Sequence, residues 1–230
     1  MKRSVLITGG TGGLGSVATR KLLDVGWRVV VPWLVEDELS RLDPHPDLHL
    51  VQANLANQDA LEHVVETAAS DAAAPLFGVV NLVGGFTSGT RVHETPLGVL
   101  EQQLDLNLRT AYSVTQDALP HLIRGGGGSV VCMSAAATRR PFASAAQYIT
   151  SKAAITALVE ALAVEYSGDR IRVNALLPTV IDTPANRAVM PDADRTSWAT
   201  PCAIAEVIAF LLSDGSAAVT GGSIPVSHAP

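Results

Sequence analysis

Short apolar runs alternate along the chain with longer stretches of helical pattern. The runs are continuously apolar, which is typical of strands that are buried on both faces. Strands that alternate with helices form a parallel sheet with helices packed on both of its sides. The pattern therefore predicts an α/β fold, a doubly wound Rossmann domain with a seven-stranded parallel sheet. The expected strands are Val5–Thr8, Arg28–Val31, Leu48–Gln52, Val79–Val83, Ser129–Met133, Arg172–Leu176 and Ser223–Val226.

Composition narrows the class of protein. The chain has 230 residues, of which 47% are hydrophobic, so it can bury one substantial core and we expect a single domain over residues 1–230. The net charge of −6, with no long basic run, disfavours a nucleic-acid partner. Two cysteines provide no disulfide framework, and the apolar runs are far shorter than the ~20 residues of a membrane span. We expect a cytoplasmic protein with no membrane partner.

A glycine-rich segment, Thr8–Gly15, lies between the first apolar run and a helical pattern over Ser16–Val25. Glycines allow a tight turn and let a pyrophosphate approach the backbone amides, where the helix dipole favours negative charge. The next expected strand follows at the distance of a βαβ unit. A flexible glycine-rich loop is the alternative, but the strand and the helix that flank the segment favour a dinucleotide site.

Tyr148 and Lys152 lie four residues apart at the start of an Ala-rich helical pattern, so both side chains are on one helix face. A tyrosine phenol titrates at about 10 and is a poor acid near neutrality. A cation one turn away stabilises the phenolate and lowers its pKa. The spacing therefore predicts an acid–base pair in which Lys152 lowers the pKa of Tyr148. His45 and His49 are also four apart, but the prolines around His45 prevent a helix, so no metal site is expected.

Together the two motifs resemble the short-chain dehydrogenase/reductase family over nearly the whole chain. The segment Asn81–Gly84 is similar to its Asn-Asn-Ala-Gly element, and Arg172–Pro178 is similar to the segment that covers the nicotinamide. The resemblance implies an NAD(P)-dependent oxidoreductase acting on a small molecule, in which Tyr148 exchanges a proton and Lys152 holds the cofactor ribose. Asn107 would orient a water beside Lys152; the alternative is a helix-interior Asn bonded to a nearby carbonyl.

The resemblance also implies the cofactor contacts. These are Thr8, Gly9, Thr11, Gly13, Leu14, Gly15, Trp33, Asn54, Leu55, Val83, Gly84, Tyr148, Lys152, Pro178, Ile181 and Thr183. Trp33 ends the second expected strand, where an acid would select NAD and an arginine would favour NADP. Trp33 would either stack on the adenine ring as a platform or simply pack against the edge of the sheet. Because Glu36 and Asp37 would repel a phosphate from just beyond Trp33, NAD(H) is favoured over NADP(H).

The catalytic serine of the family is displaced in this chain. Its usual position falls on Ala135, and Ser134 lies one residue earlier. That serine normally donates to the substrate oxygen and its developing charge. Either a local shift lets Ser134 serve as a fourth catalytic residue, or the donor is lost, and the register favours loss.

Loss of the donor agrees with a narrower resemblance to dihydropteridine reductases, which also lack this serine. It is carried by the segments Leu177–Arg187, Met190–Asp194, Ser197–Trp198 and Val83–Phe86. A quinonoid dihydropterin-like substrate is therefore favoured, although Asn107 follows the general family. The alternatives are a carbonyl reductase or alcohol dehydrogenase that uses Ser134, and a catalytically idle dinucleotide-binding sensor or scaffold.

Two larger features complete the expectations. Residues Thr183–Trp198 would form a mobile lid over substrate and nicotinamide, with Thr183 at its hinge and Val189, Met190 and Trp198 as apolar anchors. Helices around Leu100–Leu122 and Ala153–Val164 are apolar on more faces than one core contact needs. A homodimer or homotetramer is therefore expected.

Overall fold

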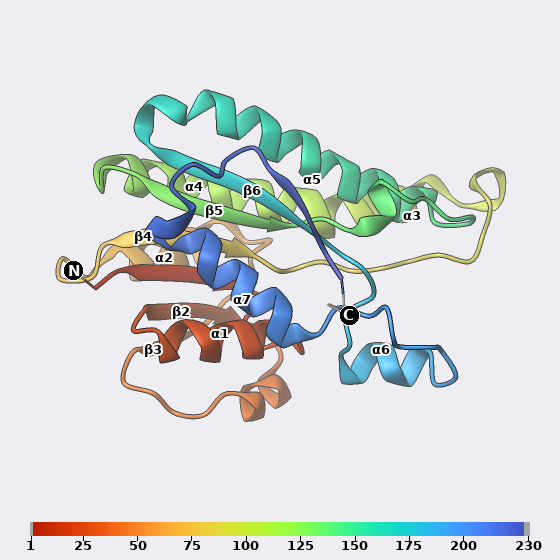
Figure 1. Ribbon diagram of the computed structural model, residues 1–230, viewed down its shortest axis with the longest axis horizontal. Helices are drawn as coiled ribbons and strands as arrows, with labels where there is room; N and C mark the ends of the chain where they lie inside the picture. The colour runs from red at the N-terminus through yellow and green to blue at the C-terminus, as the bar shows by residue number, and fades with distance from the viewer. Residues whose placement is uncertain (1, 228–230) are drawn as a thin grey trace.

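A parallel seven-stranded sheet runs through the computed structural model, which describes residues 2–227 (Figure 1). Its strand order is β3-β2-β1-β4-β5-β6-β7, so the chain reverses direction across the sheet between β1 and β4. This confirms the predicted fold class. The strands are β1 Ser4–Thr8, β2 Arg28–Trp33, β3 Leu48–Gln52, β4 Leu76–Asn81, β5 Gly128–Met133, β6 Ile171–Pro178 and β7 Ser223–Val226.

Helices cover both faces of the sheet. On one face lie α1 and α7, and on the other lie α2, α4 and α5, while α3 and α6 lie near the carboxyl ends of the strands (Figure 1). Their bounds are α1 Gly15–Asp24, α2 Gln58–Ala69, α3 Leu97–Leu104, α4 Thr110–Arg124, α5 Ala146–Glu165, α6 Pro184–Val189 and α7 Pro201–Leu212.

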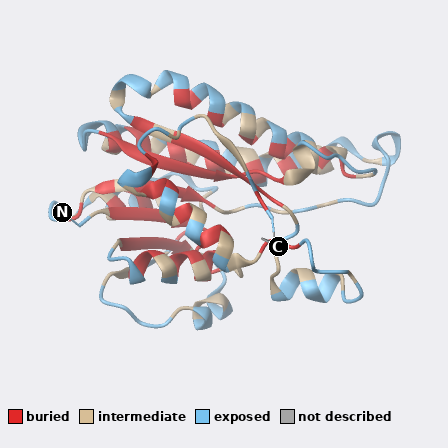
Figure 2. Ribbon diagram, in the orientation of Figure 1, coloured by how far each residue is buried: buried red, intermediate tan, exposed pale blue. Residues whose placement is uncertain are grey.

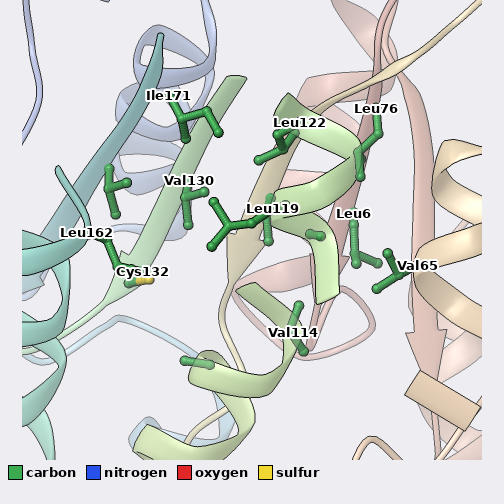
Figure 3. Close-up of a cluster of buried hydrophobic side chains, with 14 of the residues drawn as sticks. Leu6, Val65, Leu76, Val114, Leu119, Leu122, Val130, Cys132, Leu162 and Ile171 are labelled. Atoms are coloured by element: carbon green, nitrogen blue, oxygen red, sulfur yellow. The ribbon is translucent and has the colours of Figure 1, made fainter. Parts of the chain in front are cut away.

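Alternate residues of each central strand enter different cores. Leu6 and Val130 belong to the cluster shared with α2, α4 and α5 (Figure 3), whereas Val5 and Val131 belong to the cluster shared with α1 and α7. Both clusters are buried, as the red strands and helix faces of Figure 2 show. This double burial is why the strands read as continuous apolar runs instead of alternating ones.

Two expected elements differ from the structure. The fourth strand is Leu76–Asn81 and not Val79–Val83, because the chain leaves the sheet after Asn81 to cross the glycine-rich loop. The expected helix around Leu100–Leu122 is interrupted by a π-helical turn over Asp105–Arg109. Such turns arise where an extra residue is accommodated, and they are frequent at functional sites.

Candidate active site

The glycine-rich loop folds back on itself at the carboxyl end of β1. Gly9 has φ +68°, in the left-handed region that favours glycine. A Cβ atom on Gly15 would lie 1.9 Å from the Gly9 carbonyl oxygen, so no side chain fits there. The loop therefore leads directly into the N-terminus of α1, the arrangement that binds phosphate groups.

A cavity of about 470 Å³ opens beside this loop at the point where the sheet reverses. It brings together six of the predicted cofactor residues, one of which is a glycine of the loop. Those six are Gly9, Thr11, Trp33, Asn54, Leu55 and Val83. Asn54 also accepts a hydrogen bond from the Ala56 amide at 3.1 Å, which closes the turn after β3.

Glu38 was not predicted as a site residue, and it lines this cavity. Its carboxylate accepts a hydrogen bond of 2.7 Å from the Thr11 hydroxyl and pairs with Arg41 at 2.9 Å. The Thr11 hydrogen bond, with Arg41 beside it, holds the pKa of Glu38 below its usual range. Glu36 and Asp37, the acids named from the sequence, are exposed and do not line the cavity.

Asn107 and Lys152 converge on Gly84, after the end of β4. A Cβ atom on Gly84 would lie 2.5 Å from Asn107 Oδ1 and 2.9 Å from Lys152 Nζ. The Asn107 amide group both accepts from the Gly85 N–H at 2.9 Å and donates to the Gly85 carbonyl at 3.1 Å. These hydrogen bonds join residues that are 22 positions apart in the sequence. Asn107 therefore does not merely bond a neighbouring carbonyl of its own helix.

The π-helical turn and α5 are joined through Ser151. Asn107 Nδ2 donates to Ser151 Oγ at 3.0 Å, and Ser151 Oγ donates to the Tyr148 carbonyl at 2.8 Å. Gln103 also accepts from Asn107, at 3.2 Å. This chain of bonds fixes the first turn of α5, which carries the predicted acid–base pair.

Burial governs the titration of that pair. Lys152 is 5% exposed, and burial lowers its pKa to about 8. Its ammonium donates to the Met133 carbonyl at 3.0 Å. Burial raises the pKa of Tyr148 to about 12. The expected lowering of the Tyr148 pKa by Lys152 is not found in this arrangement, where burial of the phenol alone accounts for the shift.

Ser134 lies at the end of β5 with its hydroxyl turned into the body of the protein. It is 2% exposed, donates to the Lys152 carbonyl at 2.8 Å and lies 3.1 Å from the Thr156 hydroxyl. Ala135 follows it and is also buried. The serine hydroxyl thus has two partners inside the fold and links β5 to α5.

The segment after β6 reaches the glycine-rich loop. A Cβ atom on Gly13 would lie 3.3 Å from the side chain of Thr183, which caps α6. Pro178 ends β6, and Ile181 forms an isolated bridge with Ala199. Thr183 therefore lies against the glycine-rich loop, and α6, which it caps, lies near the carboxyl ends of the strands in Figure 1.

The anchors of the segment 183–198 differ from those expected. Trp198 is 4% exposed and does hold the segment, but Val189 is 78% exposed and anchors nothing. Instead Arg187 makes a two-pronged ion pair with Asp182, at 2.6 and 2.7 Å. The charged residues in this part of the sequence were the signal from which this ion pair could have been predicted.

Two further groups near Tyr148 were missed. Phe86 packs edge-on against the Tyr148 ring and lies beside Phe142. Phe86 directly follows the Gly84–Gly85 pair, which was a signal for its position. Nothing in the sequence around Phe142 indicated its position, because its neighbour in space, Phe86, comes from a different loop. Arg139, in the loop between β5 and α5, is turned toward β7, where its guanidinium donates a hydrogen bond to the Ser223 carbonyl at 2.8 Å.

Comparison with known proteins agrees with this fold. Residues 9–228 match the family model described as enoyl-(acyl carrier protein) reductase. L-xylulose reductase of Bos taurus is 30% identical over 97% of this chain and 94% of its own length. A short-chain type dehydrogenase/reductase from Mycobacterium ulcerans has a TM-score of 0.89 and 25% identity over 97% of this chain and 88% of that one. ElxO, solved with NADP bound, has a TM-score of 0.90 at 20% identity, covering 98% and 97% of the two chains.

The fold and the site define a dinucleotide-dependent oxidoreductase. The chain belongs to the short-chain dehydrogenase/reductase family, and it is an NAD(P)-dependent oxidoreductase of small molecules. Within residues 2–227, none of the helices has the length and apolar character that a membrane crossing requires. No group of three His, Cys, Asp or Glu side chains is placed to hold a metal in that same part of the chain.

Proposed function

We propose that this oxidoreductase reduces a planar, conjugated substrate of the quinonoid dihydropterin type, with Tyr148 as the proton donor. The observation that carries the proposal is the environment of Ser134. Its hydroxyl is committed to two partners inside the fold, and Ala135 occupies the position at which the family keeps its donor. Reduction of a quinonoid ring does not concentrate charge on one carbonyl oxygen, so it does not require that donor.

Each residue of the site has a part in the reaction. A bound nicotinamide supplies the hydride. Tyr148 supplies the proton from its phenol, which stays protonated at neutral pH because its pKa lies near 12 in the free protein. Lys152 exchanges its bond to the Met133 carbonyl for one to the cofactor ribose, and its pKa of about 8 keeps the proton exchangeable. Asn107 orients a water that connects Lys152 to solvent.

Glu38 makes NADH the preferred cofactor in this proposal. Its carboxylate lines the adenosine cavity and neutralises Arg41, the cation that would otherwise attract a ribose phosphate. The ribose hydroxyls of NADH can instead donate to Glu38. Trp33 lines the same cavity and would act as the adenine platform.

The remaining proposals concern the form of the protein. One sheet with two cores supports a single domain over residues 1–230, with the segment 183–198 as a lid. Both cysteines are free, one of them exposed, which supports a cytoplasmic location. Exposed apolar side chains on α4 and α5, among them Tyr112 at 49% and Val164 at 77%, support a homodimer or homotetramer.

A carbonyl reductase that uses Ser134 is the second candidate. It is supported by the likeness to L-xylulose reductase, whose name describes a sugar-ketone substrate. In that case Ser134 must exchange its partners in the fold for the substrate oxygen.

Tyr148→Phe should keep cofactor affinity and lower turnover at least about a hundredfold, because positioned acid–base groups contribute 10²–10⁴ in rate. Single-turnover rates and cofactor titration measure the two effects. Tyr166→Phe is the matched control, at the C-terminal end of the same helix. Near-normal turnover of Tyr148→Phe would remove this residue from its role.

Ser134→Ala separates the two candidates. If the site has lost the serine that donates to the substrate oxygen, the turnover rate of Ser134→Ala should change less than about tenfold. If Ser134 is that donor, turnover should fall by about 10²–10³. Ser129→Ala removes another buried serine hydroxyl of β5, one bonded to the Leu211 carbonyl, and controls for the loss of stability. A several-hundredfold drop specific to Ser134→Ala would reject the pterin-like assignment.

Glu38→Gln should raise the kcat/KM ratio of NADPH to NADH by roughly tenfold or more, since a like charge a few ångströms away costs ~1–4 kcal/mol near a surface. The substitution also frees Arg41. Glu36→Gln lies on the same 3-10 helix but outside the cavity, and should leave the ratio unchanged. An unchanged ratio in Glu38→Gln would reject Glu38 as the selecting group.

Amide exchange should slow across residues 183–198 when NADH is added, and slow further with substrate. The segment has few buried apolar contacts, as a closing lid requires. Hydrogen exchange followed by mass spectrometry measures this directly. Equal exchange in free and cofactor-bound protein would mean that the segment is not a lid.

Light scattering at tens of micromolar should give the mass of a dimer or a tetramer. Replacing Val164 by Glu places a charge on the exposed face of α5 and should shift the mass toward the monomer. A monomer in the unaltered protein would contradict the proposal.

A further inference from the structure

Phe86 packs against Tyr148, and Phe142, from a separate loop, packs against Phe86. Phe86 lies on the loop after β4, and Phe142 precedes α5. The ring centroids of Phe86 and Tyr148 are 4.9 Å apart with the planes at 82°, an edge-to-face contact. Those of Phe86 and Phe142 are 6.3 Å apart at 41°. We call Phe86 and Phe142 the aromatic rim.

The rim leaves much of its apolar surface in water. Phe86 is 60% exposed and Phe142 is 50% exposed, although phenylalanine is usually buried. Aromatic rings attract one another in offset or edge-to-face arrangements at the separations found here. A third ring placed on the rim would extend this cluster and remove its exposed surface from water, and the rim would keep that ring next to the Tyr148 phenol.

A backbone hydrogen bond ties the two loops together. The Gly89 N–H donates to the Ser144 carbonyl at 2.9 Å. Gly89 has φ +122°, which glycine adopts freely, whereas Ser144 has φ +63°, a strained conformation that L side chains rarely take. Strain of this kind persists only where the surroundings hold it, and it is concentrated at functional sites. The bond fixes the loop of Phe86 against the loop of Phe142.

We propose that the aromatic rim selects substrates that carry a planar aromatic or quinonoid ring and positions that ring against Tyr148. The inference rests on the proposed function, in that Tyr148 is the proton donor. It adds the residues that choose the substrate: ring recognition by two side chains on loops, separate from the residues that hold the cofactor.

The test compares ligands that differ only in ring type. Benzyl alcohol and cyclohexylmethanol are titrated into the protein saturated with oxidised cofactor, and reduction of a quinonoid dihydropterin is assayed separately. The preference for the aromatic ring is the ratio of the two dissociation constants. Phe86→Leu and Phe142→Leu keep an apolar side chain and remove the aromatic face. Each should lower the preference for the aromatic ring by about two- to tenfold, the range expected for one aromatic pair.

Matched controls separate the rim from general damage. Phe210→Leu changes an equally exposed phenylalanine on α7 and should leave the preference unchanged. Gly89→Ala should reduce the preference as the rim variants do, because φ +122° is strained for alanine, whereas Gly168→Ala has open space and should have no effect.

The outcomes distinguish the two proposals. If the quinonoid dihydropterin is not reduced but benzyl alcohol binds preferentially and the rim variants lower that preference, the rim stands and the proposed reaction fails. If the quinonoid dihydropterin is reduced and the rim variants weaken the binding of both alcohols equally, the reaction stands and the rim is overturned. Equal binding of both alcohols to the unaltered protein would also overturn it.

Discussion

The site depends on the absence of side-chain volume where the chain crosses itself at the carboxyl ends of β1 and β4. At Gly15 a single methyl group would collide with the Gly9 carbonyl, so the loop and α1 can close only on glycine. At Gly84 the same methyl group would displace Asn107 and Lys152. The first crossing leaves backbone amides free for a pyrophosphate, and the second lets two polar side chains from different helices meet. The phosphate cradle and the meeting of Asn107 with Lys152 therefore both depend on a glycine at the point of crossing.

Much of the fold could be predicted because its physical causes are local. Burial of both sheet faces leaves continuous apolar runs, and a phosphate loop needs glycines between a strand and a helix. The spacing of Tyr148 and Lys152 likewise depends only on helix geometry. What escaped prediction depends on contacts between distant segments. Asn107, in the π-helical turn, is held by its hydrogen bond to Gly85. Glu38 reaches the cavity only because its 3-10 helix folds back to Thr11. The position of Phe142 depends on its contact with Phe86.

The titration of the acid–base pair shows the same limit. Helix spacing places Tyr148 and Lys152 on one face. Their pKa values depend on how deeply each side chain is buried, and the spacing in the sequence carries no information about burial. Desolvation moves the pKa of Tyr148 up and that of Lys152 down, so in the free protein both groups are displaced toward their neutral forms.

The central claim is that hydride leaves a nicotinamide held beside Tyr148. Single-turnover oxidation of NADH deuterated at C4, on one face or the other, tests it most directly with a quinonoid dihydropterin as acceptor. Deuterium on one face alone should slow the oxidation, because only one face of a fixed ring meets the substrate. Equal rates with both labelled forms and with ordinary NADH would contradict it.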